Sequence, residues 1–166
     1  MNITIKKGHD IQISGVPSGE IGSQYKPEKV ALLPIEFRCI KPKLLVKEGD
    51  QVQIGSPLFF NKSVPKIKWA SPGGGIVSEI KFGPRRVIEK VEIELDKHEN
   101  KISMHQHSEQ EISRLTREII IDTLLDSNLF HLIRQRPYNK VANPDDIPRD
   151  IFISCINSSS NTWFNY

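Results

Sequence analysis

The stretch "VKEGDQVQIGSPLF", residues 46–59, predicts two turns between short β-strands. Gly49 and Gly55 supply the backbone freedom that tight turns require, and Asp50 follows the first glycine. Apolar residues flank both turns and are expected to face a small core. The stretch therefore indicates a β-rich domain in this part of the chain.

Short alternating segments recur about every ten residues through the first hundred residues, a spacing typical of a small barrel or sandwich. Further turns are expected at Gly8 and at Gly75, the last glycine of "SPGGG". In residues 87–95 the period of two places Val87 and Val91 on one face and Ile88 on the other. The expected strands are 3–7, 11–13, 30–33, 44–46, 52–54, 57–60, 66–70, 76–82 and 87–95.

The pattern changes after residue 96. Residues 97–112 are polar and rich in His, so we interpret them as a linker. From residue 113 apolar residues recur at helical spacing through Ile133, with a break near Asn128 and a stop at Pro137. The apolar run "IFISCI" at 151–156 then predicts a strand buried on both faces, as in a parallel α/β sheet.

Composition restricts the classes of function. The chain has 166 residues and a net charge of +3, with Lys and Arg scattered, which argues against a nucleic-acid partner. No run approaches the roughly 18 apolar residues of a membrane span. Cys39 and Cys155 stand apart in apolar settings and are expected to be buried thiols. These features favour a soluble, cytoplasmic chain.

Lys62 is the residue that a carrier function would use. A lipoyl or biotinyl lysine projects from a tight hairpin, and Lys62 lies between two expected strands. Its neighbours are Asn61 and Ser63, whereas lipoyl domains place Asp-Lys there and biotinyl domains place Met-Lys-Met. A surface lysine is therefore the favoured interpretation, with a modified lysine kept as the alternative.

Other candidate sites lack a complete pattern. The glycine run 73–75 has no GK[ST] ending and precedes a strand, so a turn is favoured over a phosphate loop. His98, His105 and His107 have no partners at metal-ligand spacing. No catalytic, cofactor-binding or metal-binding residue is assigned.

Arginines remain as candidate contacts with a partner. Arg85 and Arg86 follow a Gly-Pro turn and suit an ionic contact with a partner protein or lipid head group, or simply form a charged turn. Arg136 is added to this set of possible interface residues.

Three ordered stretches carry a resemblance to a known family. They are "IKKGHDIQISGVP", the long segment from "VALLPIEFRC" through "VIEKVEIE", and "LLDSNLFHLIRQRPYNKVANP". The long segment contains the E-G-D turn, a lysine after the second strand, the S-P-x-x-G turn and a G-x-x-R start to the last strand. Together they resemble the A-subunit family of the sodium-translocating NADH:quinone reductase, the Nqr complex, over roughly residues 1–157.

The resemblance implies an α+β fold. A lipoyl/biotinyl-like barrel-sandwich hybrid at 1–96 would be followed by a linker at 97–112. Residues 113–166 would hold helices and the first strand of an incomplete Rossmann-like domain. The tail "SSSNTWFNY" departs from the family pattern.

The same resemblance implies a function. The chain would be a peripheral scaffold or assembly subunit on the cytoplasmic face of the bacterial inner membrane, without catalytic activity of its own. The complex couples NADH oxidation and ubiquinone reduction to sodium export, using flavins and iron–sulfur held by other subunits. The expected partners are the membrane-embedded B, D and E subunits and the C and F subunits, with ubiquinone contact left open. A carrier domain and an independent small-molecule-binding module are the alternatives.

Overall fold

The computed structural model describes residues 22–23, 25–98, 100–104 and 106–153. Lys26–Ile147 form one compact unit, and the elements below all belong to it. The strands expected at 3–7 and 11–13, and the turn at Gly8, lie outside the described residues.

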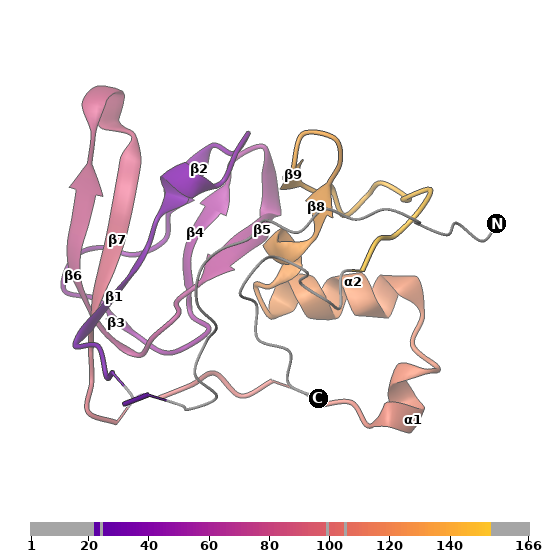
Figure 1. Ribbon diagram of the computed structural model, residues 1–166, viewed down its shortest axis with the longest axis horizontal. Helices are drawn as coiled ribbons and strands as arrows, with labels where there is room; N and C mark the ends of the chain where they lie inside the picture. Colours follow the sequence, from indigo (N-terminus) through magenta and orange to yellow (C-terminus); the bar gives the residue numbers. More distant parts are fainter. Residues whose placement is uncertain (1–21, 24, 99, 105, 154–166) are drawn as a thin grey trace, which may run out of the picture. The chain divides into compact units, whose positions relative to one another are not determined.

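Two antiparallel sheets make up the β-rich part of this unit (Figure 1). The first has the order β1-β7-β6-β3 and the second has the order β2-β4-β5. The first sheet contains β1 (Lys29–Leu32), β3 (Gln51–Val52), β6 (Gly75–Phe82) and β7 (Ile88–Leu95). The second contains β2 (Pro42–Leu44), β4 (Pro57–Asn61) and β5 (Val64–Ala70). Single 3-10 turns lie at Pro34–Glu36 (η1) and Pro84–Arg86 (η2).

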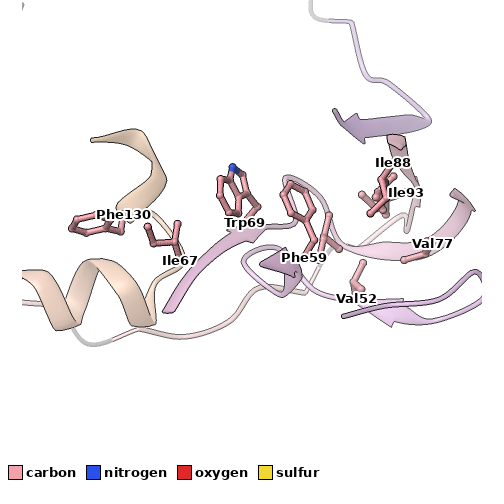
Figure 2. Close-up of a cluster of buried hydrophobic side chains, with 10 residues drawn as sticks. Val52, Phe59, Ile67, Trp69, Val77, Ile88, Ile93 and Phe130 are labelled. Atoms are coloured by element: carbon pink, nitrogen blue, oxygen red, sulfur yellow. The ribbon is translucent and has the colours of Figure 1, made fainter. Parts of the chain in front are cut away.

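The core contains apolar side chains from both sheets and from a later segment (Figure 2). Trp69 and Phe59 of the second sheet are fully buried, and so are Val91 and Ile93 of the first. Figure 2 shows Phe130, which follows the helices, beside Ile67 of β5. The buried members of the core are Val52, Leu58, Phe59, Ile67, Trp69, Val77, Ile88, Val91, Ile93 and Phe130.

A β-bulge changes the face that the start of β7 presents. Lys81 pairs with Lys90 and Phe82 pairs with Ile88, so Glu89 is an extra residue in β7. The expectation that Val87 shares the face of Val91 was wrong, because alternation shifts at this bulge. Ile88 is buried, whereas Val87 is 46% exposed.

Glu92 of β7 connects three strands of the first sheet. Its carboxylate accepts hydrogen bonds from Lys90 (2.7 Å), Lys29 of β1 (2.9 Å) and Ser78 of β6 (3.0 Å). These bonds, that of Lys90 first, lower the pKa of Glu92 to about 2. The carboxylate is therefore ionised throughout the physiological range.

The segment after the barrel is helical only in part. A capping box at Ser108 and Glu111 begins α1 (Glu109–Ile112), inside the segment interpreted as a linker. The Thr116 hydroxyl caps α2 (Arg117–Asp126). A 3-10 turn, η3 (Phe130–Leu132), and the hairpin of β8 (Arg134–Gln135) and β9 (Lys140–Val141) follow. With strands predominating and few helices, the predicted α+β class is confirmed.

Three local expectations need correction. The second helix, expected to continue through Ile133, is only the short turn η3, because Asn128 has a φ of 57° and ends the helical path. Cys39 is exposed rather than buried and lies in a turn with a φ of 62°, while Cys155 lies outside the described residues. Of the strand expected at 151–156, residues 151–153 form no strand and are exposed, and residues 154–156 lie outside the described residues.

Candidate functional site

The E-G-D turn of the opening stretch is fixed to strand β6. The Asp50 carboxylate accepts a hydrogen bond from the Lys47 amide (2.8 Å). The Gly49 amide, at a φ of 90°, donates to the Val77 carbonyl (2.9 Å), and the Val77 amide donates back to the Asp50 carbonyl (3.0 Å). These bonds continue the pairing of β3 with β6, so the turn is held against the first sheet.

Two further glycines of the predicted turns allow close backbone contacts. Gly55 has a φ of 94°, and its amide donates to the Ser71 carbonyl (3.0 Å). At Gly75 a Cβ would collide with the Glu94 carbonyl oxygen of β7. Both positions serve the packing of the barrel backbone.

Asn128 connects the segment after α2 to the second of these turns. Its side-chain amide donates to the Gly55 carbonyl (3.1 Å), 73 residues away in sequence. Asn128 is 5% exposed, and its left-handed backbone is a conformation that Asn tolerates better than most residues. One residue thus ends α2 and attaches the following chain to the barrel.

His131 continues this attachment through an aromatic cluster, which we define as Phe37, Phe59, Trp69 and His131. The His131 ring stacks on Trp69 with centroids 5.3 Å apart, and Trp69 stacks on Phe59 at 4.9 Å. Phe37 meets both Trp69 and His131 edge-on. Such pairs contribute about 0.5–1.5 kcal/mol each beyond the area they bury.

The polar groups of the aromatic cluster favour a structural role. His131 Nδ1 donates to the Asn128 carbonyl (3.0 Å), and the indole N–H of Trp69 has no hydrogen-bond partner among the described residues. The cluster holds no carboxylate, thiol or hydroxyl that would act beside the imidazole. The arrangement is suited to joining two segments of chain rather than to acid–base chemistry.

Lys62 lies at the turn between β4 and β5. The buried Asn61 side chain accepts hydrogen bonds from the amides of Lys41 and Ser63, both at 3.1 Å, and so shapes this turn. Lys62 itself is exposed. The hairpin therefore presents a lysine, while its preceding residue is buried for structural reasons.

The candidate interface arginines lie on two separate hairpins. Arg85 and Arg86 occupy the turn between β6 and β7, and Arg136 occupies the turn between β8 and β9. All three are exposed. Figure 1 places the two hairpins apart, so the structure does not bring these residues into one patch.

Charged side chains elsewhere form no ligand cluster in the part of the chain that the structure describes. No group of three or more potential metal ligands is found there, and His98 and His107 lie outside any such group. His105 is not among the described residues. A shallow depression between β5 and α2 is lined by Lys66, Lys68, Asp122, Leu125 and Asp126.

Sequence reasoning missed the residues that join the barrel to the later segment. The helical pattern predicts a break at Asn128 and a second helix over Phe130 and His131, and it indicates no contact with the barrel. The available signal was Asn128 itself, a residue that tolerates the left-handed conformation and that directly follows a helical pattern. Nothing in the local pattern identified Trp69 as the partner of His131.

The burial of His131 predicts a pH-dependent stability. Burial lowers its pKa from the usual 6.5, against the opposing backbone groups of Asn128 and Lys68, and Arg134 lowers it further. The unfolded chain takes up the proton at a higher pH than the folded chain does. The contribution of His131 to the free energy of unfolding should therefore be fully present above pH 6.5 and should fall as the pH drops toward the folded pKa. Urea denaturation from about pH 7.5 to about pH 5.5 measures this fall.

The matched variants are His131→Phe and His98→Phe. The first keeps an aromatic ring on Trp69 without titrating and should show a smaller fall than the parent chain. The second removes an exposed imidazole and should retain the parental profile. An unchanged pH profile in His131→Phe would contradict the assignment.

Comparison with known proteins adds the family. A family model described as the NqrA N-terminal barrel-sandwich hybrid domain matches residues 3–96, and one described as the NqrA second alpha/beta domain matches residues 115–161. The first match confirms the barrel-sandwich hybrid expected from the resemblance. Two matched segments thus flank the stretch that carries α1.

Individual relatives agree with the family models. The A subunit of Na(+)-translocating NADH-quinone reductase from Tolumonas auensis is 39% identical over 157 residues, 95% of this chain. The proteins of the same name from Pseudomonas aeruginosa and Saccharophagus degradans are 35% and 36% identical over 94% and 95% of the chain. The chain spans 35% of the length of each of these relatives. The barrel, its turn pair and these matches together establish that the chain belongs to the NqrA family, the A subunits of Na(+)-translocating NADH-quinone reductase.

Proposed function

We propose that the chain serves as a scaffold and assembly element of a sodium-translocating NADH:ubiquinone reductase. In this complex NADH oxidation and ubiquinone reduction are coupled to sodium export. The observation that carries the proposal is the barrel with its fixed turns, matched to the NqrA N-terminal domain. The partners are the B, D and E subunits in the membrane and the C and F subunits.

The chemistry of the described residues supports a scaffold rather than a redox centre. The side chains of the aromatic cluster pack closely around Trp69, which is fully buried. The depression between β5 and α2 is walled mainly by charged side chains, which do not suit the apolar ring of a quinone. The proposal assigns the flavins and the iron–sulfur centre to other subunits.

A peripheral position follows from the same proposal. Across the described ranges no helix has the length and apolar character needed to cross a bilayer. We place the chain on the cytoplasmic face of the bacterial inner membrane, held there by the membrane subunits.

A carrier domain modified at Lys62 is the second candidate, because the exposed lysine lies at the β4–β5 turn. The scaffold proposal predicts that the intact mass of the full chain, produced in cells that make lipoyl and biotinyl ligases, equals the mass of the sequence. A mass increment that disappears in Lys62→Ala would favour the carrier. Lys66→Ala, on the same hairpin, is the control for a modification at another lysine.

The scaffold proposal also predicts assembly with the complex. The full chain should bind saturably to the Tolumonas auensis complex purified without its A subunit, and the full-length A subunit from that organism should compete for the site. The bound chain should bring no flavin absorbance of its own. Absence of binding at micromolar concentration, or stoichiometric flavin on the free chain, would contradict the proposal.

A further inference from the structure

The turn that joins β6 to β7 and the last residue of β6, Phe82, together form residues 82–87, which we call the hairpin tip. Figure 1 shows this turn extending past the ends of the neighbouring strands. We propose that the hairpin tip is the point at which the chain docks into a concave, acidic site on another protein subunit of the complex. The inference rests on the proposed function and names the surface and the chemistry of its partner.

The hairpin tip has a defined backbone shape. The Gly83 amide donates to the Val87 carbonyl (2.8 Å), and the Val87 amide donates to the Pro84 carbonyl (3.3 Å). The Arg86 amide donates to the Gly83 carbonyl (3.1 Å). The side chains of the turn are therefore presented from a closed, hydrogen-bonded loop.

Both arginines of the turn have an unfavourable backbone conformation. Arg85 has a φ of 57° and Arg86 has a φ of 59°, in the left-handed region. A non-glycine residue there costs roughly 1–2 kcal/mol, a cost that glycine avoids. Arginine at both positions therefore destabilises the turn, which points to a contact of the side chains with another molecule.

The arginine side chains have no such contact within the described part of the unit. Among the described residues neither guanidinium makes an ion pair or a side-chain hydrogen bond, and both residues are exposed. The nearby carboxylate of Glu89 lies 3.6 Å from the amine of Lys81. The two guanidinium groups are left as fork-shaped donors, which match carboxylates in bidentate geometry.

Apolar side chains flank the charges. Phe82 is 50% exposed and Val87 is 46% exposed, one on each side of the turn. Aromatic residues, Phe included, and arginine are both enriched in protein interfaces relative to the rest of the surface. The combination fits a partner pocket with an apolar wall and carboxylates at its base.

A protein partner is favoured over a lipid surface. Each basic residue contributes about 1 kcal/mol to binding an anionic membrane, so two arginines give only weak attachment. Stable attachment to a membrane requires a second strong signal, and two apolar side chains on a narrow turn expose little area for insertion. A closed turn with two oriented guanidinium groups is better suited to a shaped site.

The experiment measures binding of the full chain to the Tolumonas auensis complex lacking its A subunit. The main variant is Arg85→Gly/Arg86→Gly, which removes both charges while relieving the left-handed backbone. Its free energy of unfolding should equal or exceed that of the parent chain. Its dissociation constant should rise by about tenfold or more, and the salt dependence of binding should decrease.

Matched controls separate the site from general charge. Lys47→Ala/Lys62→Ala removes two exposed charges elsewhere on the barrel and should bind like the parent chain. Phe82→Ser should weaken binding while leaving its salt dependence unchanged. Arg85→Lys/Arg86→Lys keeps the charge without the fork and should bind with intermediate affinity.

The outcomes distinguish the docking point from the scaffold function. Parental binding by the double glycine variant would overturn the hairpin tip as the docking point and leave the scaffold function standing. An equal loss of affinity in Lys47→Ala/Lys62→Ala would overturn it as well. Failure of the parent chain to bind would overturn both. Vesicles with anionic lipid form a separate arm: loss of vesicle binding with unchanged binding to the complex would assign the arginines to lipid and contradict the proposal.

Discussion

The structure depends on the packing around Trp69. Its ring is fully buried, stacks on Phe59 of the neighbouring strand, and receives the ring of His131 from a segment much later in the sequence. The Asn128 bond to Gly55 lies at the same junction. Together these contacts place the residues that follow α2 in the core of the barrel, so that folding of the barrel and attachment of the later segment use the same side chains.

These contacts, which we call the joint, connect the two segments matched by the family models. One match ends at residue 96 and the other begins at residue 115, yet Phe130 from the second belongs to the core of the first. In a carrier domain the barrel exposes one lysine for modification. Here the barrel holds another part of the chain, and its turns are fixed by backbone contacts such as that of Gly75 with β7.

The strands were predictable because their evidence is local. Alternation and turn residues located β6 and β7, and the E-G-D turn was recognisable from Gly49 and Asp50. The bulge at Glu89 was missed, although the sequence carried a signal for it: Glu89 puts a charge on the expected apolar face, and the apolar Ile88 falls on the other face. The joint was also hidden, because a stack of His131 on Trp69 is set by tertiary packing, and a helical period continued through the very residues that pack into the barrel.

The central claim is that the barrel and the segment after α2 form one cooperative unit. Native-state hydrogen exchange of the full chain tests it through two amides: Leu45, bonded to Leu58 in the barrel, and Ala142, bonded to Ile133 beside the joint. We predict that both exchange with the same opening free energy, within about 1 kcal/mol, and that Trp69→Phe lowers both equally. Exchange of Ala142 at a much lower opening free energy, unaffected by Trp69→Phe, would contradict the account.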